Sequence, residues 1–164
     1  MATTIIGIAD MNIVRAPDKI STIGLGSCCG VVLYDSRFKI SGMVHVLLPR
    51  STPGGDVVNK AKFADTGIVL LAQKLAAQMA PVKPMFKCKL AGGAHMFNYS
   101  SATAKNDLLN VGARNVQVCK EVLKAMRIPI VAEDTLGTYG RTITFDPETE
   151  KLLIKTAGQG ERTI

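Results

Sequence analysis

Only two stretches of this chain repeat their apolar residues at helical spacing, and this limits the possible folds more than any other feature. The segments 61–79 and 112–126 have this spacing, and each is soon followed by a proline that a helix does not accommodate. The other apolar runs are short and rich in β-branched residues, which is typical of strands: 20–25, 28–34, 40–48, 86–90, 128–132, 141–145 and 151–156. Few of these runs are separated by a helix, so we expect an α+β fold, a layered α/β sandwich of mostly antiparallel strands with two main helices.

The chain is long enough for one domain with a proper hydrophobic core. Compact domains usually have about 100–200 residues, and this chain has 164, of which 47% are hydrophobic. No repeat or low-complexity segment divides it, and the longest loop-like stretches are 50–59 and 99–107. We therefore expect a single domain over residues 1–164.

The apolar runs and the first residues favour a cytoplasmic protein. No run approaches the ~18 apolar residues that a membrane helix needs, and residues 1–4 lack the charged start of a secretory signal. We expect no membrane insertion. Because cytosolic thiols stay reduced, the four cysteines are expected to serve packing, metal binding or chemistry.

The charge favours an acidic partner without defining it. Lys and Arg number 20 against 13 Asp and Glu, a formal net charge of +7. A nucleic-acid-binding surface usually clusters its basic residues and interleaves aromatic ones, whereas here the basic residues are scattered. We therefore expect no nucleic-acid partner.

The glycine-rich segment 24–30 surrounds two neighbouring cysteines, Cys28 and Cys29. Its glycine spacing differs from the dinucleotide-binding fingerprint, and it lacks the Lys-Ser or Lys-Thr that ends a phosphate-binding P-loop. It does provide a permissive backbone next to a thiol. Cys28, Cys29, His45 and His95 lack the Cys-x-x-Cys spacing of zinc sites, so neither a metal nor a cofactor is predicted.

A hairpin of the strands around Cys28 and His45 would bring these two residues together. If its turn is centred between Ser36 and Arg37, Cys28 lies directly opposite His45, and opposed residues have Cβ atoms about 4.5–5.5 Å apart. The other face of the hairpin would then be uniformly apolar, which favours this register. That face would hold Cys29, Val31, Leu33, Phe38, Ile40 and Val44.

A thiol next to an imidazole is a nucleophile with its base. A free thiol has a pKa near ~8.5 and is mostly protonated at neutral pH, and an adjacent imidazole can take its proton. We therefore expect Cys28 to be partly ionised and reactive, with His45 as its base and Cys29 in the core. Cys88 and Cys119 lie on apolar faces and are expected to be buried packing residues.

Several further segments resemble the CheD family, the chemoreceptor glutamine deamidases of bacterial and archaeal chemotaxis. The similarity covers nearly the whole chain, and its blocks occur in the same order. They are Thr22-Ile23-Gly24-Leu25-Gly26-Ser27-Cys28, His45, Lys62-Phe63-Ala64-Asp65-Thr66, Ala91-Gly92-Gly93-Ala94 with Met96-Phe97, Asn110-Val111-Gly112-Ala113-Arg114-Asn115, and Ala132-Glu133-Asp134-Thr135.

The resemblance implies a catalytic set of Cys28, His45 and Thr22 on a fold like that of other protein-glutamine deamidases. Thr22 would accept a hydrogen bond from the imidazole and so hold the ring toward the thiol. Backbone N–H groups of Ser27, Cys28 and Cys29 are candidates to stabilise the oxyanion. The implied partners are the cytoplasmic domain of methyl-accepting chemoreceptors and a CheC-type phosphatase.

Two other functions compete with deamidation. The protein could be a non-catalytic adaptor that binds chemoreceptors or the CheC phosphatase, or a cysteine protease, although no protease signature is present. Release of ammonia separates deamidation from both. The sequence departs from the family pattern at Cys29, His95 and Leu136, which bears on loop shape and substrate detail more than on reaction type.

Overall fold

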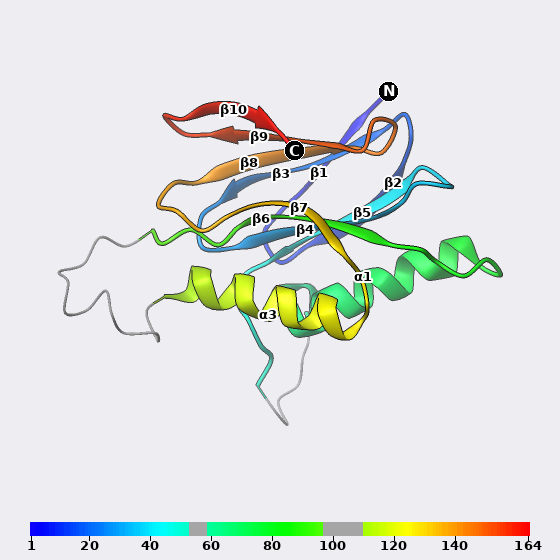
Figure 1. Ribbon diagram of the computed structural model, residues 1–164, viewed down its shortest axis with the longest axis horizontal. Helices are drawn as coiled ribbons and strands as arrows, with labels where there is room; N and C mark the ends of the chain where they lie inside the picture. Colours follow the sequence, from blue (N-terminus) through cyan, green and yellow to red (C-terminus); the bar gives the residue numbers. More distant parts are fainter. Residues whose placement is uncertain (53–58, 97–109) are drawn as a thin grey trace.

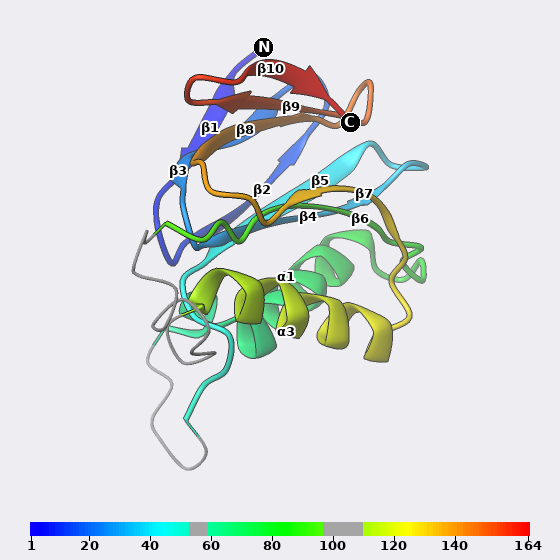
Figure 2. The same cartoon turned by 60° about the vertical axis from the view of Figure 1, so that its left-hand side comes forward.

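Two five-stranded sheets and a pair of helices form three layers (Figures 1 and 2). The computed structural model describes residues 1–52, 59–96 and 110–164. The first sheet has the order β1-β3-β8-β9-β10, the second the order β2-β5-β4-β6-β7. Among these residues, all strand pairings are antiparallel except β1 with β3 and β6 with β7. The predicted α+β fold of mostly antiparallel strands with two helices is therefore confirmed.

The elements follow one another without a repeating unit. The first sheet contains β1 (Thr3–Ile6), β3 (Lys19–Leu25), β8 (Arg141–Asp146), β9 (Lys151–Thr156) and β10 (Gly160–Thr163). The second contains β2 (Met11–Arg15), β4 (Cys29–Asp35), β5 (Ile40–Val46), β6 (Lys87–Gly92) and β7 (Ile130–Thr135). The helices of the described residues are α1 (Ala64–Met79) and α3 (Val111–Ala125), and a short 3₁₀ turn, η1 (Lys60–Lys62), precedes α1.

The second sheet lies in the middle layer, so both of its faces are buried. This explains why every residue of β4 and β5 is buried and why their sequences are apolar on both faces. One core lies between this sheet and the helices and includes Cys29, Val31 and Leu33. A second core lies between the two sheets and includes Cys28, Val32 and Tyr34. Alternation along β4 thus sends neighbouring cysteines into different cores.

A bulge in β3 turns the strand immediately after Thr22. Ile20 and Thr22 face the inter-sheet core, and simple alternation would send Leu25 outward. The pairing with β8 shifts between Thr22 and Leu25, and Gly24 takes a φ of +75°, a conformation that glycine adopts without strain. As a result Leu25 returns to the core, while Ile23 is 62% exposed.

The hairpin of β4 and β5 has a different register from the predicted one. Asp35 pairs with Ile40 and Gly30 pairs with His45, so the turn is centred between Arg37 and Phe38. The Asp35 carboxylate accepts hydrogen bonds from the backbone and side chain of Arg37, and this contact builds a four-residue loop. The offset is two residues, which keeps each side chain on its predicted face.

Most other sequence predictions agree with the structure within one to three residues. Both helices and all the predicted strands are confirmed, but the first turn of the helix predicted over 61–79 is wrong, because Phe63 has an extended backbone and η1 precedes it. Phe38 is 39% exposed in the turn and does not join the apolar face. The prediction missed β1, β2 and β10, which are short strands. Residues 53–58 and 97–109, with most of the two predicted loops and Phe97, lie outside the described residues.

Candidate active site

Thr22 and His45 face each other across the space between the two sheets. Thr22 comes from β3 and His45 from β5, and neither side chain is exposed to solvent. The Thr22 Oγ1 atom lies 2.7 Å from His45 Nδ1. This contact is the one that the resemblance implied, although nothing in the sequence other than that resemblance distinguished Thr22 from an ordinary strand residue.

The hydrogen bonds of Thr22 determine the tautomer of His45. Thr22 has one hydroxyl proton, which it donates to the carbonyl oxygen of Ile6 at 3.0 Å, and that oxygen can only accept. Thr22 Oγ1 must therefore accept from His45, so Nδ1 carries the imidazole proton. In a neutral ring the other nitrogen, Nε2, then has a free lone pair. Nε2 is buried and has no hydrogen-bond partner among the described residues, so it is available as a base.

Cys28 lies on the same side of the second sheet as His45, immediately before β4. It is 6% exposed and belongs to the inter-sheet core. Because Gly30 is the residue opposite His45, Cys28 is a diagonal neighbour of the imidazole and not the directly opposed one that the sequence predicted. Diagonal neighbours in a regular ladder are roughly 7–8 Å apart, which remains within reach of a histidine side chain. The predicted direct pairing is therefore wrong, and contact between the thiol and the imidazole stays a prediction.

Burial keeps both groups neutral at rest. It raises the pKa of the Cys28 thiol above its ordinary value, and the backbone N–H of Cys28 itself offsets part of this rise. Burial also lowers the pKa of His45 to about 4. At neutral pH the site therefore holds a thiol and an uncharged imidazole. The expectation of a partly ionised Cys28 is wrong, because burial between the two sheets disfavours the charged thiolate.

Cys29 is part of the core between the second sheet and α3. It is fully buried, and a hydrogen bond with Cys119, together with burial, raises its pKa well above the usual value. Cys88 and Cys119 are fully buried as predicted. Ser27 is partly buried, and its carbonyl oxygen accepts a hydrogen bond from α3. Cys28 is thus the cysteine that shares the inter-sheet space with His45.

A glycine pair at the end of β6 packs against the backbone of residues 26–28, which we call the nucleophile segment because it holds the candidate nucleophile Cys28. Gly93 donates its N–H to the Cys28 carbonyl oxygen, and Ala94 donates to that of Gly26, both at 2.9 Å. Gly92 has a φ of +108°, and a Cβ atom there would lie 2.2 Å from the Cys28 carbonyl oxygen. Only glycine fits this close approach. The sequence marked these glycines only as part of a resembling block and did not predict their contact with Cys28.

A buried ion pair supports the same loop from the first sheet. Arg141 is 2% exposed, and its Nε donates to the Asp134 carboxylate at 2.9 Å. A second guanidinium nitrogen lies 3.4 Å from the Gly92 carbonyl oxygen. The ion pair connects the start of β8 to β7, and the hydrogen bond connects it to the end of β6, so both contribute to the position of the loop behind Cys28.

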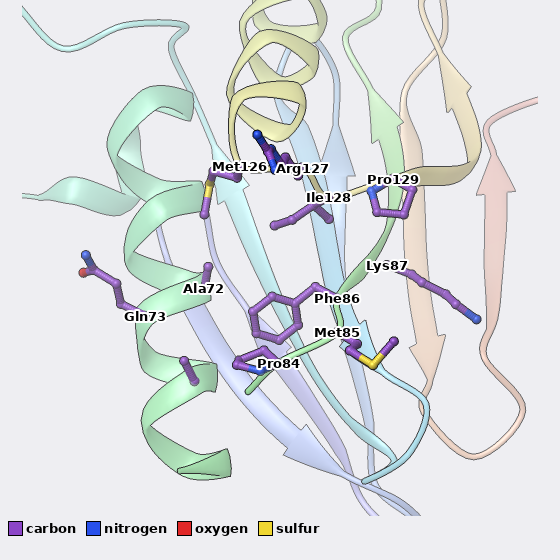
Figure 3. Close-up of a pocket in the computed structure, with 11 residues that line it drawn as sticks. Ala72, Gln73, Pro84, Met85, Phe86, Lys87, Met126, Arg127, Ile128 and Pro129 are labelled. Atoms are coloured by element: carbon purple, nitrogen blue, oxygen red, sulfur yellow. The ribbon is translucent and has the colours of Figure 1, made fainter. Parts of the chain in front are cut away.

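A groove at the other end of the helical layer lacks the reactive side chains of the candidate site. Figure 3 shows it between α1 and the segments before β6 and β7, with Phe86, Ile128 and Pro129 among the residues that line it. Its volume is about 610 Å³, and its lining contains no thiol, imidazole or carboxylate. The Cys28 segment instead contacts the first turns of α3. The candidate site therefore lies away from this groove.

Metal-binding clusters and membrane-spanning helices are not found in the described ranges. Residues 1–52, 59–96 and 110–164 contain no group of three or more His, Cys, Asp or Glu arranged to hold a metal ion. Within the same ranges neither helix is long and apolar enough to cross a membrane.

Comparison with known proteins gives one consistent result. A family model described as CheD chemotactic sensory transduction matches residues 47–156. A protein of Lachnoclostridium phytofermentans, named probable chemoreceptor glutamine deamidase CheD, is 52% identical over 97% of this chain and 96% of its own length. A chemoreceptor glutamine deamidase CheD of Halalkalibacterium halodurans is 48% identical over 97% of this chain and 96% of its own length. These alignments include the strands before residue 47, and so the region that holds Thr22, Cys28 and His45.

Proposed function

This chain belongs to the CheD family, and we propose that it converts glutamine side chains of chemoreceptors to glutamate with release of ammonia. The names of its full-length relatives support the reaction. The observation that carries the chemistry is the 2.7 Å contact between Thr22 Oγ1 and His45 Nδ1, which leaves Nε2 as an unprotonated base in the inter-sheet space that also holds Cys28. In this proposal Cys28 is the nucleophile, His45 the general base and acid, and Thr22 the residue that orients His45.

The first half of the reaction forms a thioester. His45 Nε2 takes the thiol proton as the Cys28 sulfur attacks the carboxamide carbon of the glutamine side chain. Because the resting pair is neutral, proton transfer accompanies attack and does not precede it. The imidazolium that forms then gives its proton to the departing nitrogen, which leaves as ammonia. Thr22 accepts the Nδ1–H bond throughout and stabilises the imidazolium.

The second half of the reaction restores the enzyme. His45 Nε2 takes a proton from water, and the resulting hydroxide attacks the thioester carbonyl. The carbon–sulfur bond breaks, glutamate is released, and the sulfur regains the proton from the imidazolium. The sum of the two halves is one glutamine and one water converted to one glutamate and one ammonia. The product gains a negative charge that the substrate lacked.

Each half passes through a tetrahedral oxyanion, and backbone N–H groups near Cys28 are the proposed donors. Ser27, Cys28 and Cys29 are the candidates. The N–H of Cys28 is favoured, because it lies against the sulfur that forms the new bond and already lowers the pKa of that thiol in part. One such donor typically accelerates a reaction by about 10²–10³-fold.

The proposed substrate also defines the proposed partners and compartment. The cytoplasmic domain of a methyl-accepting chemoreceptor would carry the glutamines, so the protein would act in the cytoplasm. Binding to a CheC-type phosphatase stays a prediction that rests on the family resemblance. An adaptor without catalysis would bind the same partners but would not need a buried, hydrogen-bonded Thr22–His45 pair.

Mass spectrometry of a receptor cytoplasmic fragment incubated with this protein tests the proposal. We expect specific glutamines to become glutamates, with one ammonia released for each conversion. Binding without any mass change would favour the adaptor function, and cleavage of the peptide chain would favour the protease. Either result would overturn the proposed deamidation.

A further inference from the structure

One buried amide on α3 connects the nucleophile segment to the strand that carries the base. Asn115 is fully buried, and its Nδ2 donates to the carbonyl oxygen of Ser27 at 2.9 Å and to that of Leu47 at 3.1 Å. Ser27 immediately precedes Cys28, and Leu47 lies two residues after His45. A single nitrogen atom therefore binds the backbone on both sides of the proposed reaction centre.

The orientation of this amide follows from its partners. Both acceptors are carbonyl oxygens, which cannot donate, so the Asn115 nitrogen and not its oxygen must face them. Both N–H groups of the amide are thereby used. Its Oδ1 is buried without a hydrogen-bond partner among the described residues. Most buried polar atoms in proteins are hydrogen-bonded, so the orientation of this amide is set by its two donor contacts and not by its oxygen.

The contact with Ser27 has a direct geometric consequence for Cys28. The carbonyl of Ser27 and the N–H of Cys28 belong to one planar trans peptide, so they point in opposite directions. Because Asn115 holds the Ser27 carbonyl toward α3, the N–H of Cys28 must point away from α3, toward the side on which the thiol lies. Rotation of this peptide would remove the N–H from the place where the oxyanion forms.

Resting on the proposed deamidation, we propose that Asn115 is a positioning residue that fixes the Ser27–Cys28 peptide so that the Cys28 N–H can bind the oxyanion. Its second hydrogen bond, to Leu47, keeps that peptide at a constant distance from the strand of His45. Asn115 itself touches neither the substrate nor the reacting atoms. Its effect is therefore on the transition state, where the oxyanion exists, and not on substrate binding.

The substitution Asn115→Leu tests this with a side chain of similar size and branching. It removes both donors that face the carbonyl oxygens and adds no charge, and Asn115→Ala is a second variant in case the first does not fold. With a receptor cytoplasmic fragment as substrate, we expect kcat to fall by about 10²–10³-fold, the effect of losing one oxyanion donor, while KM changes little. Alkylation of Cys28 by iodoacetamide forms no oxyanion, so its rate should stay near that of the wild type.

Val118→Ala is the matched control. Val118 is a buried residue of the same helix that makes neither of these hydrogen bonds, so its truncation should weaken the fold but leave kcat unchanged. Wild-type kcat in both Asn115 variants would overturn the inference. Equal losses of kcat and of the Cys28 alkylation rate would also overturn it, because they would indicate a general distortion of the site. Absence of ammonia release by the wild-type protein would overturn the proposed function. A loss confined to the Asn115 variants concerns only the role of Asn115, so the two failures are distinguishable.

Discussion

Replacement of Thr22 by valine would remove a single hydroxyl from the inter-sheet space and keep the shape of the side chain. This hydroxyl makes two buried hydrogen bonds, to the Ile6 carbonyl at 3.0 Å and from His45 Nδ1 at 2.7 Å. A buried group that loses its partner costs about 1–3 kcal/mol, so the free energy of unfolding should fall by roughly 2–6 kcal/mol. The bond from the imidazolium in the transition state is charge-assisted and worth about 1.5–3 kcal/mol, which corresponds to a roughly 10- to 150-fold loss of kcat.

Ammonia release from a receptor cytoplasmic fragment at saturating concentration measures this loss. Thr22→Ser keeps the hydroxyl and should restore most of the activity that Thr22→Val loses. Thr144→Val is a matched control, because it removes a hydroxyl bonded to Ser21 on the other face of the same sheet, and its kcat should equal that of the wild type. Wild-type kcat in Thr22→Val, or an equal loss in Thr22→Ser, would refute the role of this hydroxyl in orienting His45.

Three further predictions concern the neighbouring cysteines, pH and the glycine loop. Cys29→Ala should keep most activity at a cost of about 1 kcal/mol in stability. Peptide mapping after iodoacetamide treatment should find Cys28 labelled first. An inactive Cys29→Ala variant would mean that Cys29, and not Cys28, is the nucleophile. Because the pKa of His45 is about 4, the base is uncharged above that pH, so kcat/KM should fall near pH 4 and not near 6.5. The unfolded state binds this proton at higher pH than the folded state does, so the free energy of unfolding should decrease by roughly 3 kcal/mol as the pH falls from 6.5 to 4. Urea denaturation at several pH values measures this change. A free energy of unfolding that does not vary with pH over this range would contradict the burial of a neutral His45. Gly92→Ala should abolish activity and lower the thermal unfolding temperature far more than Gly158→Ala does. Both glycines have a positive φ, but of the two only Gly92 would place a Cβ atom 2.2 Å from another atom. Equal effects of the two substitutions would mean that backbone strain at positive φ, and not this close contact, causes the loss.

The sequence predicted the layers of the fold because hydrophobic periodicity reports which faces are buried. The two helices and the inner strands of the second sheet carry a strong pattern, since these strands are covered on both faces. The strands β1, β2 and β10 are short and lie at sheet edges, where little apolar surface is buried, and so their sequences show no clear pattern. The hairpin register was wrong by two residues, because the hydrophobic pattern repeats every two residues and cannot detect such a shift.

The candidate site was predictable in its residue types and less so in its geometry. Alternation along the strands and the family resemblance both separated Cys28 from Cys29, and the structure places them in different cores. The protonation states were not predictable, because they depend on burial between two sheets that are distant in the sequence. The hydrogen bonds of Asn115 were not predictable for the same reason, because its partners, Ser27 and Leu47, are far from it along the chain.

Direct detection of a thioester on Cys28 tests the central claim most closely. A short glutamine peptide from a receptor that the wild-type protein deamidates would be mixed with the protein, quenched in acid within the first turnover, and analysed by mass spectrometry. The proposed mechanism predicts a peptide attached to Cys28 with the mass of one ammonia missing, and no adduct and no ammonia release in the Cys28→Ala variant. Ammonia release by Cys28→Ala at the wild-type rate, with no adduct on Cys28 of the wild-type protein, would contradict it.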